Sequence, residues 1–476
     1  MPPVTGTIPC ENSMNPCRPA EIKRWSIKAG ALLSLCFAAP PVGAADPSIS
    51  SFKPTATCSE EIRRVNGDKR DLWTYMVDKV EPPQQIQLIA YIFDTDETGL
   101  RLLRHLIDAS VRGVKVQLLI DGVGPGVSMP INGDLVAAIR QMAPGLEIRV
   151  FNPKSRILRI RKRAHDKLFL AGDYAIVGSS SIWDASAKGW LIEEDVALRD
   201  LTPGHSDVFA RMRSHFQLFW QSPYSVEIQP GKGRQQRAGT QAILRKLQAV
   251  PLHTTNGLDA AAVPVSAGDA FCPSLRYYHD QPDKSRDDGT LGGVLQLIDE
   301  ARREIVIVNP YILLVPEVRG VLKRKIQAGV RVVILTASIV NLSNEFPPLA
   351  KAYANDLPAL ARDGFEVREY LDPLEGRMLH AKVMRVDNHS YFVGSFNFDP
   401  LSARHNTENG IRVDYPASRK SRLADELDRE ISALLEGATL VADGHGRLVV
   451  DDPQRCTQIN CKNPLRWLGP LIRGSL

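Results

Sequence analysis

The sequence repeats one strand–helix–strand pattern in two distant stretches of the chain. Residues 86–121 contain an apolar strand, leucines at helical spacing and a second apolar strand, and residues 304–337 follow the same plan. Gly113 of "RGVKVQLLID" aligns with Gly329 of "AGVRVVILTA". A glycine that ends a helix before a buried strand is a common connection in α/β proteins. The repeat therefore predicts an α/β fold with two homologous halves, each a mixed sheet flanked by helices.

The rest of the chain divides around these halves. We predict a first half over residues 46–230, a linker or insert over 231–270, a second half over 271–440 and a C-terminal tail over 441–476. The polar stretch "QPGKGRQQRAG" marks the linker. The tail is apolar with basic flanks, so it docks on the domain or contacts a membrane surface; the Gly469-Pro470 interruption favours docking.

The segment over residues 1–45 predicts a signal peptide. Four basic residues between positions 18 and 28 precede an apolar run over 29–39, and Val42-Gly43-Ala44 follows as a small-residue cleavage site. The run is shorter than the ~20 residues that span a bilayer. A buried N-terminal helix or an uncleaved anchor is the alternative. Cleavage would lower the formal net charge from +5 to +3, and we expect a periplasmic or secreted protein that can lie peripheral to a membrane.

Cleavage would also leave four cysteines, which suits disulfides in an oxidising compartment. Cys456 and Cys461 are close in sequence and form the favoured pair; Cys58 with Cys272 is the second. Their spacing does not fit a zinc site, so we expect no metal.

The repeat also carries chemically active residues. Each half has a histidine, a lysine at the next position but one, a Gly-Ser turn and a glutamate, and the interval from histidine to glutamate is the same in both halves. These residues are His165, Lys167, Ser179, Ser181 and Glu193 in the first half, and His380, Lys382, Ser395, Asn397 and Glu408 in the second. The interval between the two histidines matches that between Gly113 and Gly329 to within one position, so the chemistry follows the scaffold repeat.

This residue set suits displacement at phosphorus. Histidine and lysine in His-x-Lys share one face of a strand, and the Gly-Ser turn can hold anionic oxygens. A carboxylate beside each histidine would fix its tautomer and raise its pKa. One neutral imidazole would attack the phosphorus, and the other, as imidazolium, would protonate the leaving oxygen. No metal-ligand set or Walker loop is evident, so we expect no cofactor.

The second motif resembles a known family. "HAKVMRVD" followed by "GSFNFDPLSARHNTENG" is similar to the phospholipase D superfamily signature HxKxxxxD…GSxN, and its continuation resembles bacterial cardiolipin synthases and related exported proteins. The likeness extends over most of residues 80–420. It implies two phospholipase D-like α/β sandwich halves packed as a pseudo-twofold pair, with one histidine from each half in a shared site. A monomer would suffice for that site.

The resemblance also implies roles for individual residues. His165 would be the nucleophile and His380 the acid, with Glu193 and Glu408 as their orienting carboxylates. The phosphate binders would be Lys167, Lys382, Ser395 and Asn397, with Ser179 and Ser181 in the first half. Asp387 would brace a turn. The first motif departs from the pattern, because Gly172 stands where the aspartate belongs, Asp173 comes one place late and Ser181 replaces the usual asparagine. His165 and Lys167 are retained, so we expect an intact nucleophile with altered phosphate binding in the first half; an inactive first half is the alternative.

By this resemblance the chain is a phospholipase D-like enzyme that passes a phosphatidyl group from a phospholipid to water or an alcohol. Peripheral membrane contact would follow from such a substrate. The alternatives are an exported nuclease of the same superfamily and a non-catalytic phospholipid-binding protein. A charge of +3 gives little electrostatic attraction for nucleic acid. The basic run 161–163 would guide an anionic headgroup or be a solvated surface run, and Tyr91 and Tyr311 would line the cleft or pack in the core.

Overall fold

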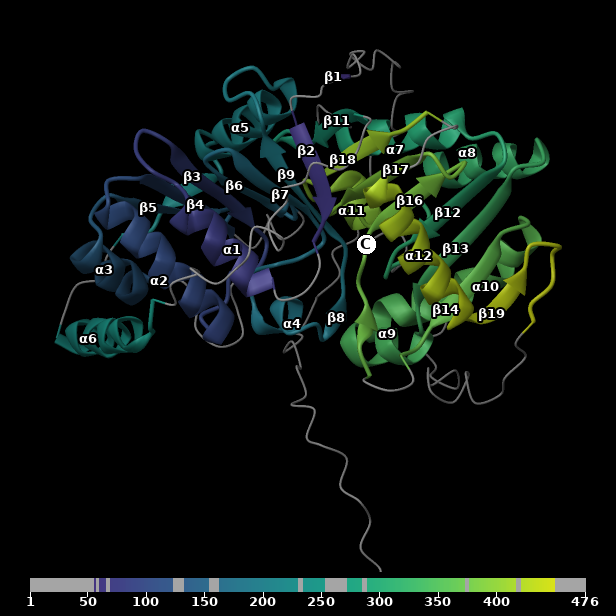
Figure 1. Ribbon diagram of the computed structural model, residues 1–476. Helices are drawn as coiled ribbons and strands as arrows, with labels where there is room; N and C mark the ends of the chain where they lie inside the picture. Colours follow the sequence, from purple (N-terminus) through teal and green to yellow (C-terminus); the bar gives the residue numbers. More distant parts are fainter. Residues whose placement is uncertain are drawn as a thin grey trace, which may run out of the picture. The chain divides into compact units, whose positions relative to one another are not determined.

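Two large mixed sheets, one in each half, form the framework of the protein (Figure 1). The computed structural model describes residues 55–56, 60–65, 69–122, 132–153, 162–229, 234–252, 272–284, 289–372, 376–416 and 421–449. All elements below belong to the unit formed by residues 47–476. The expected fold class, two α/β halves with mixed sheets, is confirmed.

The first sheet has eight strands in the order β10-β5-β4-β3-β6-β7-β9-β2. Strands β3, β4 and β5 are parallel, and the remaining pairs are antiparallel. The strands are β2 (Glu60–Arg64), β3 (Gln85–Ala90), β4 (Lys115–Asp121), β5 (Leu146–Phe151), β6 (Leu168–Ala171), β7 (Tyr174–Gly178), β9 (Asp195–Asp200) and β10 (Ser225–Glu227).

The second sheet has nine strands in the order β1-β11-β18-β17-β16-β12-β13-β14-β19, with β12, β13 and β14 parallel. The strands are β1 (Thr55–Ala56), β11 (Ser274–His279), β12 (Glu304–Val308), β13 (Arg331–Ala337), β14 (Glu366–Tyr370), β16 (Val383–Val386), β17 (Ser390–Gly394), β18 (Asn409–Asp414) and β19 (Thr439–Asp443). A separate parallel pair, β8 (Leu191–Ile192) with β15 (Met378–Leu379), joins the two halves directly.

Helices cover both sheets. They are α1 (Lys69–Asp78), α2 (Glu97–Val111), α3 (Gly133–Met142), α4 (Asp184–Ala187), α5 (Asp207–Trp220), α6 (Arg234–Ala249), α7 (Gly289–Glu300), α8 (Pro316–Gln327), α9 (Ile339–Glu345), α10 (Pro347–Arg362), α11 (Pro400–Arg404) and α12 (Arg422–Glu436). Gly113 and Gly329, which follow α2 and α8, both have left-handed backbones, with φ of 97° and 87°. Glycine adopts this conformation without the steric cost of a Cβ, which explains its place at both repeat positions.

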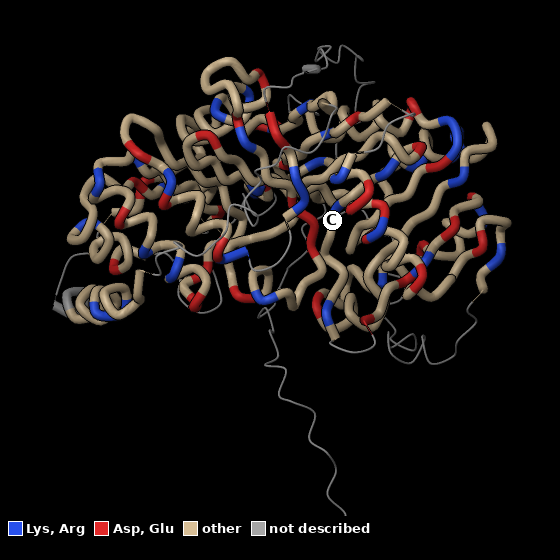
Figure 2. The backbone as a smooth tube through the Cα atoms, viewed as in Figure 1, with Lys and Arg blue, Asp and Glu red and all other residues tan. Residues whose placement is uncertain are grey.

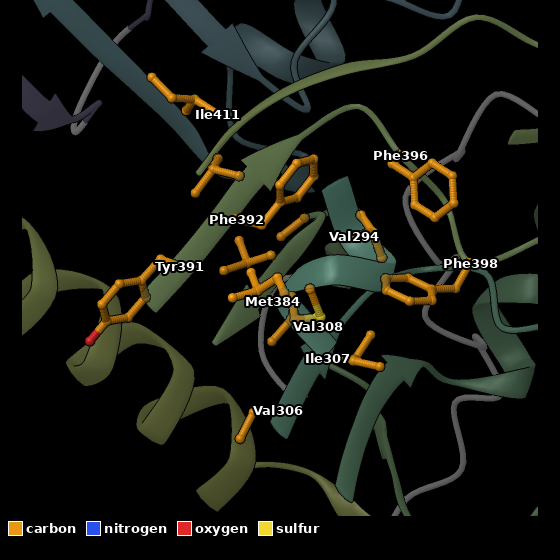
Figure 3. Close-up of a cluster of buried hydrophobic side chains, with 14 of the residues drawn as sticks. Val294, Val306, Ile307, Val308, Met384, Tyr391, Phe392, Phe396, Phe398 and Ile411 are labelled. Carbon is orange, nitrogen blue, oxygen red and sulfur yellow. The ribbon is translucent and has the colours of Figure 1, made fainter. Parts of the chain in front are cut away.

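Alternation along the strands divides the core into two layers. In β3, Leu88 faces helices α1–α3, whereas Ile89 faces α5, and Leu118 and Leu119 of β4 alternate in the same way. The layer that contains Ile89 continues into the second half as one buried cluster. Figure 3 shows its second-half part, which includes Val306, Ile307 and Val308 of β12, Met384 of β16, Phe392 of β17 and Ile411 of β18. The halves therefore share a hydrophobic core.

Three elements depart from the predicted boundaries. Helix α6 lies inside the predicted linker 231–270 and buries Ile243, Leu244 and Leu247 against the first half. In the sequence, the polar stretch 229–239 includes the first turns of α6 and obscures the short apolar face that follows it. Strand β19 pairs with β14, so the second sheet passes the boundary predicted at residue 441, and β1 joins the second sheet although it precedes the first.

Several predictions fall on segments outside the described residues. These are the signal peptide over residues 1–45, the end of the tail and the pair Cys456–Cys461. Cys272 is disulfide-bonded, and Ala56 pairs with Ser274 at the edge of the second sheet. The pairing of Cys272 with Cys58 stays a prediction, because Cys58 also lies outside the described residues. No helix in the described ranges is long and apolar enough to span a membrane.

Candidate active site

The two His-x-Lys segments lie where each half pairs with the other. Both come directly before a buried strand, β6 or β16. The backbone N–H of His165 donates to the carbonyl of Thr407 at 3.0 Å, and that of His380 donates to the carbonyl of Ile192 at 2.8 Å. Each histidine is therefore held beside a segment of the opposite half, and the next residue of that segment is a glutamate.

The histidine–glutamate pairs are crossed between the halves. Nδ1 of His165 lies 2.8 Å from Oε2 of Glu408, and Nδ1 of His380 lies 2.9 Å from Oε1 of Glu193. Reading Glu193 as the partner of His165, and Glu408 as that of His380, is therefore wrong. The carboxylates are 1% exposed or less, whereas the imidazoles remain 10% and 16% exposed. A carboxylate only accepts, so Nδ1 carries the hydrogen and Nε2 is left for chemistry.

A buried lysine lies beside the reactive nitrogen of each histidine. Nζ of Lys167 is 3.2 Å from Nε2 of His165, and Nζ of Lys382 is 3.2 Å from Nε2 of His380. Each ammonium also donates to the carbonyl of its own histidine, at 2.8 and 2.7 Å. The convergence expected from the i, i+2 spacing is therefore present in both halves. Each Nε2 has a cation beside it that can offset charge on a phosphate.

Burial controls the protonation states of this cluster. It lowers the pKa of His380 to about 3, aided by the charge of Lys382, and it lowers the pKa of His165. The carboxylates oppose these shifts but do not reverse them, so the expected rise in histidine pKa is wrong in sign. Burial also lowers the pKa of Lys167 to about 8 and that of Lys382 to about 7, with Lys167 adding to the second shift.

We expect His380→Gln to reduce the acid sensitivity of the fold. Burial holds the folded pKa of His380 at about 3, below its unfolded value of about 6.5. As pH falls from 6.5 toward 3, the unfolded chain binds a proton that the folded chain does not, so the free energy of unfolding decreases. Urea unfolding at pH 7 and pH 4 should show a smaller decrease in the free energy of unfolding for His380→Gln than for the parent protein. The exposed His205→Gln should behave like the parent, and equal decreases in all three proteins would contradict the prediction.

The serine hydroxyls of the Gly-Ser turns are already engaged. The hydroxyl of Ser395 donates to Glu408 and accepts from the N–H of Asn409 at 3.0 Å. The hydroxyl of Ser179 donates to the carbonyl of Glu194 at 3.0 Å and accepts a hydrogen bond from the backbone N–H of Glu194 at 2.8 Å. Ser395 therefore positions the carboxylate and Ser179 braces the backbone. Binding of phosphate by these two hydroxyls stays a prediction.

Two further predicted phosphate binders follow these turns. The N–H of Ser181 donates to Ser186 Oγ at 3.2 Å. Oδ1 of Asn397 is buried and has no hydrogen-bond partner within the described part of the chain. A buried amide oxygen without a partner is costly, so Asn397 is the predicted binder that the structure leaves most open to a ligand.

Asp387 braces the turn between β16 and β17. Its carboxylate accepts the backbone N–H groups of Arg302, Arg303 and Glu304 at 2.8–2.9 Å, and its own backbone has φ of 52°. In the first half, Gly172 occupies the turn with φ of 59°, and the carbonyl of Asp173 accepts the N–H of Asp200 at 2.8 Å. The missing motif aspartate is thus replaced by a glycine-based turn, and His165 and Lys167 keep their places.

The two tyrosines lie at the site. The ring of Tyr91 meets the His165 ring edge-on, with centroids 4.8 Å apart, and the Tyr311 ring lies 6.1 Å from that of His380. Tyr311 also donates its hydroxyl to Glu345 at 2.8 Å. Arg163, in the basic run 161–163, is buried and donates to the carbonyl of Asn152 at 2.6 Å. The predictions that this run guides an anionic headgroup or lies on the solvated surface are therefore both wrong for Arg163.

Several supporting residues were not predicted from the sequence. Asn409 accepts the N–H of Lys167 at 2.8 Å and donates to its carbonyl at 3.1 Å, which clamps the first motif from the second half. Ser402 donates to Glu408, and Ser180 donates to Glu193 at 2.9 Å. The only sequence feature that could have identified these residues is their position close to a predicted glutamate or Gly-Ser turn. Among the described residues, no group of three or more His, Cys, Asp or Glu side chains is arranged to hold a metal ion.

Comparison with known proteins finds similarity over both halves of the chain. The family described as "Cardiolipin synthase, PLD-like domain" matches residues 80–220 and 294–435, and each range contains one His-x-Lys segment. The chain is 28% identical over 371 residues to cardiolipin synthase C of Escherichia coli K12, covering 68% of this chain and 75% of the relative. It is 28% identical over 339 residues to cardiolipin synthase B of Salmonella typhi, covering 69% and 70%.

A solved structure shares the fold. Phosphatidylserine synthase from Haemophilus influenzae Rd KW20 superposes with a TM-score of 0.63 at 15% identity, covering 87% of this chain and 95% of that one. The superposition spans both halves, which supports their arrangement as a pair of α/β domains.

Proposed function

The chain belongs to the cardiolipin synthase, PLD-like domain family, and from this premise we propose that it transfers a phosphatidyl group through a covalent intermediate on histidine. The observation that carries the proposal is the pair of imidazoles with Nδ1 held by a buried carboxylate and Nε2 beside an ammonium. A nucleophile and a proton donor for one phosphodiester are thus supplied by one chain.

In the first step, Nε2 of His165 attacks phosphorus while the bond to the leaving oxygen breaks. His380 gives its proton to that oxygen. Although burial holds the pKa of His380 at about 3 in the free protein, the negative phosphodiester beside Nε2 raises it, so the proton is taken up with the substrate. Proton transfer of this kind contributes about 10²–10⁴-fold to a rate.

In the second step, an acceptor hydroxyl loses its proton to His380 and attacks the phosphorus, and the bond to His165 breaks. The proton balance over both steps is zero. Glu408 stabilises the positive charge that the His165 ring carries in the intermediate, and Lys167 and Lys382 offset the charge on the phosphate oxygens. Glu408 and the two lysines therefore each have a role in the proposed reaction.

We propose a phospholipid as substrate, with phosphatidylglycerol as both donor and acceptor and water as a competing acceptor. Two relatives named cardiolipin synthases support this choice. The charge distribution supports lipid over nucleic acid, because Figure 2 shows basic and acidic residues interspersed along both halves. Export by the predicted signal peptide and peripheral contact with a membrane belong to the same proposal.

The test is product analysis by mass spectrometry. Purified protein with phosphatidylglycerol vesicles should form cardiolipin and release glycerol, and phosphatidic acid should accompany them where water competes. Chelation with EDTA should leave the rate unchanged. Absence of any lipid product, from vesicles and from short-chain lipid alike, would contradict the proposal. Cleavage of plasmid DNA that depends on His380 would instead favour the nuclease.

A further inference from the structure

Lys69, at the start of α1, breaks the two-fold relation between the halves of the site. Its Nζ lies 3.3 Å from Oε2 of Glu193 and 3.0 Å from Oδ2 of Asp195, and it donates to the hydroxyl of Ser180. Lys69 is mostly buried, with 11% of its side chain exposed. The carboxylate that holds His380 is therefore shared with a lysine.

The carboxylate of the other pair is held differently. Lys284 follows Lys69 by the same interval that separates the two histidines, but its Nζ donates to Asp280 at 2.6 Å and to the carbonyl of Ser402. Glu408 itself accepts from two serine hydroxyls, and in the described ranges His165 is its one ion-pair partner. The two histidines thus face carboxylates of unequal effective charge.

This inequality has a direct electrostatic effect. Charges interact strongly at a buried site, so a lysine beside Glu193 cancels part of the negative potential at His380. Lys69 is cationic there: burial lowers its pKa, but Asp195 and Glu193 together raise it above the ordinary value. Burial raises the pKa of Glu193, but Lys69, His380 and Lys382 lower it to about 2. Lys167 and Lys284 also lower the pKa of Glu408, but within the described ranges neither forms an ion pair with it as Lys69 does with Glu193, so we expect its negative potential at His165 to be offset less.

We propose that Lys69 is a positioning residue which, through Glu193, weakens the hold of His380 on its proton and makes it the stronger acid of the two histidines. Glu408, whose charge is offset less, then favours His165 as the ring that gains positive charge on becoming phosphorylated. This assignment rests on the proposed transfer reaction. It explains how two similar half-sites take different roles.

The first test does not depend on activity. The full chain is labelled with ¹³C at histidine Cε1, and the His380 resonance, identified with His380→Gln, is followed by NMR as pH falls. In Lys69→Gln the midpoint of His380 should rise by ~1 pH unit or more, because the potential of Glu193 is no longer offset. Lys69→Arg should restore the parent behaviour. Lys79→Gln, which removes an exposed lysine at the other end of α1, should have no effect.

The second test separates acid strength from general damage. A weaker acid slows departure of a poor leaving group more than departure of a good one. Lys69→Gln should therefore lower turnover of phosphatidylglycerol by roughly three- to tenfold, but leave turnover of a p-nitrophenyl phosphodiester within about twofold. A purely structural role would lower both rates alike.

Folding of each variant is checked by circular dichroism and thermal unfolding, and Lys69→Met replaces Lys69→Gln if the latter does not fold. A folded neutral variant with an unchanged His380 midpoint, or with an equal rise for His165, overturns the proposal. If the parent turns over no phosphodiester, the proposed function fails while the NMR result still decides the role of Lys69.

Discussion

Replacing either histidine of the site by alanine is expected to lower phosphatidyl transfer by about 10⁴-fold or more without unfolding the chain. His165→Ala removes the nucleophile and His380→Ala removes the proton donor, and neither ring belongs to the hydrophobic core. Initial rates of cardiolipin formation measure the effect. His205→Ala, which changes an exposed histidine, should keep a rate within about twofold of the parent.

A substrate with a good leaving group distinguishes the two histidines. p-Nitrophenolate leaves without a proton, so His380→Ala should still form the covalent adduct from a p-nitrophenyl phosphatidyl ester and accumulate it. His165→Ala should form none. Mass spectrometry of peptides from acid-free digests locates the adduct. An adduct on His380 in the His165→Ala protein would reverse the roles, and full lipid turnover in either variant would exclude the two-histidine mechanism.

Glu408→Gln is expected to have the second largest effect, a loss of about 10²–10³-fold in turnover. The amide cannot balance the positive charge that forms on His165 in the intermediate. It also places an NH₂ group among hydroxyl donors, because Ser395 and Ser402 both donate to this carboxylate. One donor then loses its acceptor, which should lower the free energy of unfolding by about 1–3 kcal/mol.

The crossed pairing supplies a matched control for this variant. The NMR titration of His165 should change in Glu408→Gln and stay nearly unchanged in Glu193→Gln, while that of His380 should respond in the opposite way. Urea unfolding gives the stability change in parallel. A response of His165 to Glu193→Gln alone would contradict the pairing that the structure shows.

The scaffold and the reactive residue types could be predicted from the sequence because they follow local rules. Strand alternation places histidine and lysine together, and glycine at positions 113 and 329 reports a left-handed backbone in each half. The partner of each histidine could not be predicted. The glutamate downstream of each histidine is equally compatible with its own half and with the other, and only the pairing of Thr407 and Ile192 across the halves decides between them.

Burial caused the remaining differences. The sequence places a carboxylate near each histidine, which alone predicts a raised pKa, but desolvation outweighs it in both pairs. Likewise, a serine in a Gly-Ser turn can face a phosphate or a carboxylate, and Ser395 faces Glu408. Lys69 lies far before Glu193 in the chain, and no motif links positions so distant.

The crossed histidine–glutamate pairs mean that neither half can work alone. A separated first half would hold His165 without its carboxylate, and a separated second half would hold His380 without its own. Two fragments produced independently should therefore be inert singly and regain turnover only when they associate. Enzymatic activity in this protein therefore measures whether the two halves are correctly assembled. Substitutions that weaken the contact between the halves should impair the function of both histidines together.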